Sequence, residues 1–534
     1  MEIIKQIALT YSSFIPPIVK DYLNEADHLR GFVSHWHQPA GLEDALSKRG
    51  FSAEKRAVLV SHLRDQYQAA KIDLTEAEKV EHNIHSLQDG QSFTICTGHQ
   101  LSLFGGTLFM TYKILSAIKL ALNLSKQFPE HRFVPVLWLA SEDHDFEEIQ
   151  TTYLFGKEIT WETASQSMPT GKIALENIAE IVEELGVLMG NNEEAKRWFS
   201  QLHAAYVSEG NLGEATLRLY HELFKAFGLV ILDPNAKVLK SYLHDIVRAD
   251  ILGQESFAVQ QVSDAVLSEQ YKLQINARPI NFFYLSAVHG RKMIRKNEDG
   301  SYSLADSAVH WLPQEMESEI AEFPERFSPN VNLRPIYQEL ILPNLAYVGG
   351  PAEVAYWLQL KPLFDHYQVP YPLVALRYMN VIVPKNLLDK LLKMGLQIED
   401  VLLSEPNLKQ KYLEQVQGIS FPEKFDAILH SLQELVDHAK HLDVGLGKEM
   451  LDFKLQVKDF FKGKTGSIKR AAEQHEEAQI EKLLKLRARL FPKGVLQERI
   501  ETLMQHEVQI NRALLPDLLE QIEVLSGKLD ITLS

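Results

Sequence analysis

The segment from Phe133 to Glu148, FVPVLWLASEDHDFEE, holds the densest group of side chains that could do chemistry. Its apolar first half, with Val and Trp, predicts a strand buried on both faces, as in a parallel sheet. Asp143, His144 and Asp145 follow that strand, and open α/β folds bind ligands where strands end. Such groups can hold a sugar or an amine and accept a proton. We therefore predict that these three residues are catalytic, although acidic residues here could also cap a helix.

A second polar group follows another short predicted strand, 93–96. It consists of Thr97, Gly98, His99 and Gln100. A glycine-bearing loop and a predicted helix over 107–125 come next, so strand, loop, helix and strand form a βαβ unit. The loop and the helix N-terminus could offer backbone N–H groups to a phosphate or carboxylate. We predict that the four residues bind substrate. Neither the dinucleotide pattern G-x-G-x-x-G nor a Walker A pattern is present.

A third group begins with Asn344–Val348, a predicted strand followed by a turn at Gly349, Gly350 and Pro351 and then by a helix. Glu353 in the first turn of that helix either interacts with the helix dipole or binds an ammonium group. Arg377 ends a further predicted strand, 371–377. It could clamp a carboxylate or phosphate, or form a structural ion pair.

Together these motifs resemble the cysteine ligase family of bacillithiol biosynthesis, and the resemblance covers essentially the whole chain. It rests on TGHQ, SEDHDFEEI and NLAYVGGPAEVAYW. The resemblance implies an α/β fold whose Rossmann-like parallel-sheet core is similar to class I nucleotidyltransferases. It also implies substrate binding by Gly349, Gly350 and Glu353, and a homodimer supported by a coiled coil.

The reaction that the resemblance implies is the last step of bacillithiol synthesis, in which cysteine is added to the amino group of glucosaminyl malate. Forming an amide from a free carboxylate requires activation, so we expect ATP with Mg²⁺ and no permanently bound metal. The sequence departs from the nucleotidyltransferase pattern, because it has no HIGH motif and its only lysine-motif lookalike, 464–469, lies in the coiled coil.

Composition fits a cytoplasmic enzyme. The net charge of −16 disfavours nucleic acid and anionic membranes as partners. The first residues, MEIIK, do not form a signal peptide, and no apolar run is long enough to span a membrane. The single cysteine, Cys96, fits a reducing compartment, and its place in a strand predicts packing rather than catalysis.

The chain is predicted to form two domains. The first, 1–380, is the Rossmann-like core with an N-terminal helical region and inserted segments at about 151–227 and 255–330. The second, 381–534, is a helical antiparallel coiled coil. Its apolar residues recur at steps of three and four, and a turn is predicted at 463–467. The repeating residues are Phe425, Ile428, Leu432, Leu435, Ala439, Leu442 and Leu446.

Two other classes of function remain open from the sequence. The acidic turn with His99 could hold a divalent metal in an amide hydrolase or deacylase. Alternatively, the chain could be a non-catalytic scaffold whose coiled coil is the functional surface.

Overall fold

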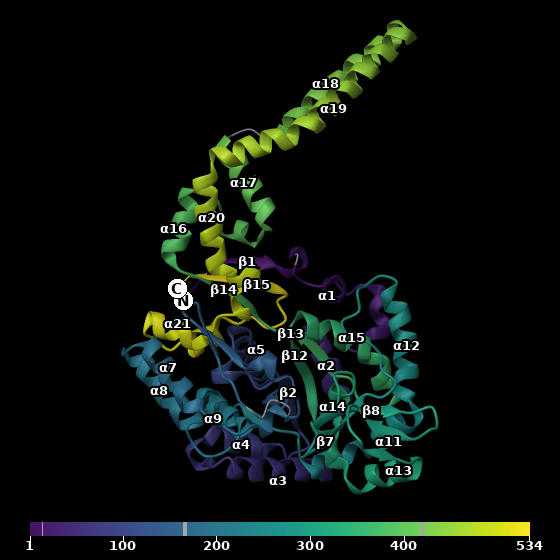
Figure 1. Cartoon of the computed structure of the whole chain (residues 1–534), viewed down its shortest axis with the longest axis vertical. Helices are drawn as coiled ribbons and strands as arrows, with labels where there is room; N and C mark the ends of the chain where they lie inside the picture. Colours follow the sequence, from purple (N-terminus) through teal and green to yellow (C-terminus); the bar gives the residue numbers. More distant parts are fainter. Residues whose placement is uncertain (13, 164–167, 418–420, 534) are drawn as a thin grey trace. The chain divides into compact units, whose positions relative to one another are not determined.

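The computed structural model of the protein describes residues 1–12, 14–163, 168–417 and 421–533 (Figure 1). The chain forms two compact units. The first contains residues 6–380 and 498–530 together with Met1, and the second contains residues 2–5, 381–497 and the segment from Ile531. The second unit is therefore mainly one continuous insertion in the chain of the first.

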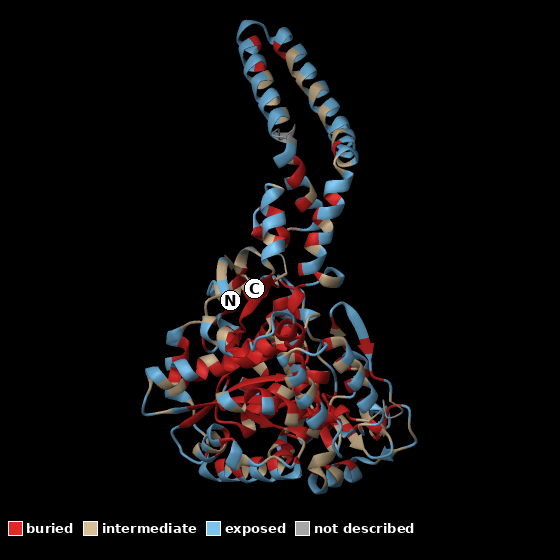
Figure 2. Ribbon diagram, turned by 90° about the vertical axis from the view of Figure 1, so that its left-hand side faces the viewer, coloured by how far each residue is buried: buried red, intermediate tan, exposed pale blue. Residues whose placement is uncertain are grey.

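The first unit is built on a five-stranded sheet in which every neighbouring pair of strands is parallel. The strand order is β13-β12-β2-β3-β6. Nearly all residues of these strands are buried, as expected for a parallel sheet covered on both faces (Figure 2). The Rossmann-like fold class is confirmed. The five strands are β2 (Ser92–His99), β3 (Arg132–Leu139), β6 (Val230–Leu232), β12 (Asn344–Gly349) and β13 (Leu373–Leu376).

Two helices follow strands of this sheet directly. Helix α5 (Leu108–Gln127) joins β2 to β3, which confirms the predicted βαβ unit. The turn before α5 needs glycine at Gly106, because φ is 68° and a Cβ would lie 2.9 Å from the Cβ of Ser102. Helix α15 (Pro351–His366) follows β12, with proline at its first position as predicted.

Longer segments connect the remaining strands. Between β3 and β6 lie α6 (Phe146–Ile149), β4 (Thr151–Leu154), β5 (Lys157–Thr160), α7 (Ile178–Met189), α8 (Glu193–Tyr206) and α9 (Leu212–Phe224). Between β6 and β12 lie α10 (Lys237–Lys240), α11 (His244–Gly253), α12 (Glu255–Ser268), α13 (Pro313–Glu322) and α14 (Arg334–Ile341). The same segment forms a sheet of order β10-β9-β8-β7-β11, whose strands are β7 (Phe282–Ser286), β8 (Gly290–Lys296), β9 (Tyr302–Leu304), β10 (His310–Trp311) and β11 (Phe327–Pro329).

The N-terminal region is helical, as predicted, apart from its first strand. That strand, β1 (Glu2–Ala8), belongs to a three-stranded sheet of order β1-β15-β14 with β14 (Met379–Val383) and β15 (Lys528–Leu533). The helices are α1 (Pro17–Leu23), α2 (Pro39–Lys48), α3 (Ala53–Ala69) and α4 (Glu78–Ser86). After the second unit, the first resumes with α21 (Leu503–Ile510) and α22 (Leu515–Gln521).

The second unit is helical and contains an antiparallel hairpin. Its helices are α16 (Lys385–Lys393), α17 (Glu405–Gln417), α18 (Phe421–Leu442), α19 (Val444–His475) and α20 (Glu477–Leu490). The predicted turn at 463–467 is wrong, because those residues lie inside α19. The hairpin turns at Asp443, whose side chain accepts a hydrogen bond from the backbone N of Leu446 at 2.9 Å. Next to this turn, a Cβ on Gly447 would lie 2.3 Å from the side chain of Lys440. Glycine at this position therefore lets α18 and α19 approach closely. The exposed glycines at 463–467 do not end α19, because a glycine inside a helix lowers the stability of that helix by only about 1 kcal/mol.

The apolar repeat of α18 is divided between two surfaces. Ala439 of the repeat is buried, as is its neighbour Val436, and Phe425 stacks on Phe461 of α19 with ring centroids 4.1 Å apart. Leu435 and Leu442, by contrast, are 53% and 70% exposed. The predicted seam therefore does not lie wholly inside the hairpin. Among the described residues, no helix is both long and apolar enough to cross a membrane.

Candidate functional site

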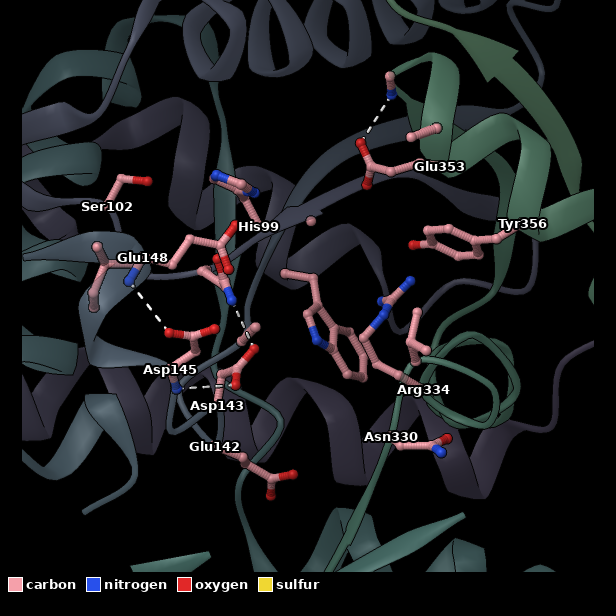
Figure 3. Close-up of a pocket in the computed structure, with 18 of the residues that line it drawn as sticks. His99, Ser102, Glu142, Asp143, Asp145, Glu148, Asn330, Arg334, Glu353 and Tyr356 are labelled. Atoms are coloured by element: carbon pink, nitrogen blue, oxygen red, sulfur yellow. Dashed lines mark hydrogen bonds between the residues drawn. The ribbon is translucent and has the colours of Figure 1, made fainter. Parts of the chain in front are cut away.

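A pocket of about 1110 Å³ lies where the parallel strands of the first unit end (Figure 3). Eight of the eleven residues predicted to form the site line it, and they follow or end four different strands. These eight are Gly98, His99, Gln100, Asp143, Asp145, Gly350, Glu353 and Arg377. Thr97, His144 and Gly349 do not line it.

Asp143 is held by hydrogen bonds from its own turn and from the end of β2. Its Oδ1 accepts from the backbone N of His144 at 2.7 Å and of Asp145 at 3.3 Å, and its Oδ2 accepts from Gln100 Nε2 at 2.9 Å. Nη1 of Arg291, a residue of β8, lies 3.6 Å from Oδ1 of Asp143. Partial burial opposes ionisation, but the hydrogen bonds from His144 and the charge of Arg291 hold the pKa of Asp143 well below its usual range. A carboxylate held in this way is a weak proton acceptor and serves best to orient the turn.

His144 is exposed, with its ring beside the second sheet. Its Nδ1 lies 3.2 Å from Nη1 of Arg291, and its ring centroid lies 5.7 Å from that of Phe283. Nδ1 also lies 3.5 Å from Oδ1 of Asp143, so without a proton it can accept from Arg291 and with one it can donate to Asp143. A catalytic role for His144 stays a prediction.

Asp145 serves both as a helix cap and as part of the pocket wall. Its Oδ1 accepts a hydrogen bond from the backbone N of Glu148 at 3.3 Å, which caps α6. Figure 3 shows Asp145, Asp143 and His99 on one side of the pocket. Within the described residues, Oδ2 of Asp145 accepts no hydrogen bond. It is therefore the predicted catalytic carboxylate with an oxygen open to a ligand.

The T-G-H-Q residues hold the end of β2 in place. Thr97 is buried, and its Oγ1 donates to the backbone O of Val348 at 2.8 Å, which ties β2 to β12. His99 packs edge-on against Phe109, with ring centroids 4.9 Å apart. Burial and the nearby charge of Lys113 lower the pKa of His99 to about 3, so the imidazole is neutral at physiological pH.

The N-terminus of α5 is closed by a later part of the chain. The backbone N of Leu108 donates to the O of Glu501 at 2.7 Å, and Thr107 forms a β-bridge with Thr502. The backbone N of Gly106 donates to the O of Leu103 at 2.9 Å. The prediction that this loop and helix end present N–H groups to an anion is therefore wrong. His99 and Gln100 reach the pocket through their side chains instead.

Cys96 is fully buried in β2, as predicted from its apolar neighbours. Burial raises the pKa of its thiol far above the usual range, which keeps the sulfur protonated. It does not line the pocket. The geometry therefore agrees with packing as the role of this residue.

Glu353 is paired with a buried lysine of α5. Its Oε1 and Oε2 lie 2.9 Å and 2.8 Å from Nζ of Lys113, and Nζ also donates to the backbone O of Gly98. The hydroxyl of Tyr347 donates to Oε1 at 2.6 Å, and the backbone N of Gly350 donates to Oε2 at 2.8 Å. Burial acts to raise the pKa of Glu353, but the charge of Lys113 outweighs it and lowers the pKa to about 2. The ammonium that Glu353 holds is therefore one from its own chain, and substrate binding by Glu353 stays a prediction.

Arg377 forms the structural ion pair that the sequence left as an alternative. Both of its terminal nitrogens bind the carboxylate of Glu498, and Nη1 also donates to the backbone O of Tyr378 at 2.8 Å. Arg377 is 2% exposed. Its Nε, however, is buried without a hydrogen-bond partner in the described part of the chain.

The pocket also contains residues that the sequence reasoning missed. Arg334 is the first residue of α14, Arg291 lies in β8, and Arg499 follows the second unit. Asn330 and Tyr356 line the pocket as well. None of these residues ends a strand of the parallel sheet, so the strand-end signal could not find them. The one available signal for Arg334 was Pro335, because proline is common at the start of a helix and so places the charged residue beside it at a helix N-terminus.

The predicted metal alternative gains no geometric support. Within the described residues, no group of three or more His, Cys, Asp or Glu side chains could hold a metal ion. His99 lines the pocket, whereas His144 does not line it and contacts Arg291.

Two family models match the chain. "Bacillithiol biosynthesis BshC, N-terminal Rossmann-like domain" matches residues 1–378, and "Bacillithiol biosynthesis BshC, C-terminal coiled-coil domain" matches residues 380–532. The chain belongs to the BshC family. Both the parallel sheet with its strand-end pocket and the helical hairpin are thus features of a BshC-family chain.

Curated relatives agree over nearly the full length. A protein of Cytophaga hutchinsonii is 34% identical over 506 residues, with 93% of each chain covered. Proteins of Flavobacterium psychrophilum and Christiangramia forsetii are 32% and 31% identical, with 98% of each chain covered. All three carry the name "Putative cysteine ligase BshC". The resemblance seen in the sequence motifs is therefore confirmed at the level of the BshC family.

Proposed function

We propose that this protein is a cysteine ligase that adds cysteine to the amino group of glucosaminyl malate and so forms bacillithiol. Membership of the BshC family and the names of the relatives support the reaction class. The observation that carries the proposal is the division of charge in the pocket. Asp143, Asp145 and Glu148 lie on one side and Arg334 on the other (Figure 3). The amino sugar is cationic and its malate is anionic, so this substrate matches both sides.

In this proposal the acidic side of the pocket receives the amine. Asp145 has an oxygen that accepts no hydrogen bond from the described residues, so it can bind the ammonium and accept a proton as the amine attacks. Asp143 fixes the backbone N–H of Asp145 at 3.3 Å and so orients this residue. Neutral His99 faces the same space and can donate to or accept from a sugar hydroxyl.

Activation of the cysteine carboxylate is proposed to come from ATP with Mg²⁺. When bound, ATP would supply a phosphoryl or adenylyl group that turns the carboxylate oxygen into a leaving group. Arg334 and Arg499 are the pocket residues whose charge suits its phosphates. The lysine-motif lookalike at 464–469 lies within α19 and so does not form a loop.

The direct test is to incubate purified protein with cysteine, glucosaminyl malate and ATP with Mg²⁺, and to look for bacillithiol by mass spectrometry. Omission of each component in turn separates a requirement for ATP from a requirement for the protein alone. We expect product only in the complete mixture. The proposal would be contradicted if the complete mixture gave no bacillithiol although the protein melts cooperatively and is therefore folded.

A homodimer through the hairpin is the second part of this proposal. Exposed apolar side chains recur every seven residues on both helices: Ile428, Leu435 and Leu442 on α18, and Leu446, Phe453 and Phe460 on α19. A heptad spacing is typical of helices that pack against another helix. A second copy of the chain supplies the same stripe, so a two-fold pairing would bury both.

A further inference from the structure

The side of the pocket opposite Asp145 holds cationic groups whose hydrogen-bonding capacity is not used. Nη1 of Arg334 donates to Gln338 Oε1 at 3.1 Å, but its Nη2 is buried and has no hydrogen-bond partner within the described residues. No carboxylate in that part of the chain forms an ion pair with Arg334. Buried donors without partners are costly, so a ligand that accepts hydrogen bonds from them gains affinity.

Arg377 presents a second such donor to the same pocket. Its terminal nitrogens are engaged by Glu498, which leaves Nε as a buried donor without a partner among the described residues. Gly350 lies in front of it. A Cβ at this position would lie 3.5 Å from Nε of Arg377 and 3.4 Å from Oε2 of Glu353. Because φ of Gly350 is −75°, the backbone does not require glycine here. The missing side chain therefore leaves space in front of Nε.

The first turn of α15 completes this side of the pocket. Gly350, Pro351 and Ala352 line it, so the positive end of a sixteen-residue helix faces the pocket. Lys113 neutralises Glu353 in that turn, so the local charge is not made negative. The N–H of Gly350 is bound to Glu353 and Pro351 has none, so this helix acts on the pocket through its dipole, whereas the N-terminus of α5 is closed by Glu501.

We propose that Arg334, Nε of Arg377 and the N-terminal turn of α15 form a subsite for an anionic group of the ligand, a carboxylate or a phosphate. The proposal rests on the proposed function for its choice of ligands. The malate carboxylates of the amino sugar and the phosphates of ATP are the two sources of that chemistry. Since the acidic turn lies across the pocket, a bound anion here directs the other end of the ligand toward Asp145.

The test compares two amino sugars that differ in the malate group, and it includes ATP as the other source of an anionic group. By calorimetry, without cysteine, we would measure dissociation constants for glucosaminyl malate, for methyl glucosaminide, which lacks the malate, and for ATP. The variants are Arg334→Gln and Gly350→Ala. The second adds a methyl group in front of Arg377 while leaving the ion pair with Glu498 intact. Arg248→Gln is the matched control, because Arg248 is a surface residue paired with Glu317.

We expect both variants to weaken binding of one anionic ligand by about tenfold to a hundredfold, with methyl glucosaminide unaffected. Loss confined to glucosaminyl malate identifies the carboxylate, and loss confined to ATP identifies the phosphate. A structural effect would weaken all three ligands equally and would overturn the subsite, as would unchanged affinity for both anions. These measurements need no turnover, so a protein that binds as expected but makes no bacillithiol would refute the proposed reaction and keep the subsite.

Discussion

The guanidinium of Arg377 and the carboxylate of Glu498 form a buried, two-pronged ion pair across 121 residues of sequence. Removing one partner leaves the other charged and buried, so Arg377→Met should lower the free energy of unfolding by about 3–5 kcal/mol. Urea denaturation measures this. The double variant Arg377→Met with Glu498→Leu should recover much of the loss, because no charge is stranded. An equal loss in both variants would show that packing, rather than charge, dominates.

The ion pair between Lys113 and Glu353 predicts that the free energy of unfolding depends on pH. The pKa of Glu353 is about 2, below its reference value of 4.5, so the folded state favours the ionised form. The stabilisation is therefore complete above about pH 4.5 and is lost as the pH falls toward about 2. In urea unfolding, Glu353→Gln should be less stable than the wild type at about pH 6, and the difference should shrink at about pH 3. A difference that stays constant with pH would contradict the assignment.

The acidic turn is predicted to be essential for activity. Asp143→Asn removes the charge that holds Arg291 and the backbone of the turn, and His144→Ala removes the ring beside Arg291. Each should reduce bacillithiol formation by about a hundredfold or more while folding persists. The readout is thiol content in a complemented deletion strain, with thermal melting as the folding control. Normal thiol levels with both variants would remove this turn from the mechanism.

Cys96 should be dispensable for catalysis. Cys96→Ala and Cys96→Ser should retain a sizeable share of activity, because the thiol is buried in β2 and the substrate brings its own sulfur. The free energy of unfolding should fall by roughly 1 kcal/mol through lost packing. The ligation assay and urea denaturation measure the two effects. Complete loss of activity in a cooperatively melting variant would assign the thiol a direct role.

The exposed apolar stripe of the hairpin is proposed to form the dimer contact, so a variant with charged residues in the stripe should be a monomer. Leu435→Glu with Leu442→Glu places carboxylates on the surface proposed to pair, and sedimentation should then show a monomer with unchanged helix content. The control, His430→Glu with His441→Glu, changes exposed positions of α18 that helix geometry places on another side. Dimers that persist in the leucine variant would place the subunit contact elsewhere.

Four of the five core strands were predicted, because each contains a short, mainly apolar run that is followed by a polar group. That rule located His99, Asp143, Gly350 and Arg377 in one pocket. It could not reveal Arg334, which lies at the start of α14 in the long segment between β6 and β12, because a local pattern does not show which distant segments meet.

The hairpin turn was misplaced for a different reason. Glycine usually marks a turn, so 463–467 was the natural choice, yet a long helix tolerates exposed glycine at a modest cost. The actual turn at Asp443 depends on Gly447, whose importance lies in contact with Lys440. Pairing of this kind is visible only in three dimensions.

The insertion of the second unit also affects the order in which the pocket is made during protein synthesis. All five parallel strands have been translated by residue 376, but Glu498, Arg499 and Glu501 come after the inserted residues 381–497. At about 5–20 residues per second, the ribosome needs roughly 6 to 25 seconds to reach them. Until then Arg377 lacks its ion pair with Glu498, and the backbone N of Leu108 at the start of α5 lacks its hydrogen bond to Glu501. A chain cut within the hairpin therefore also loses Arg499 from the lining of its pocket.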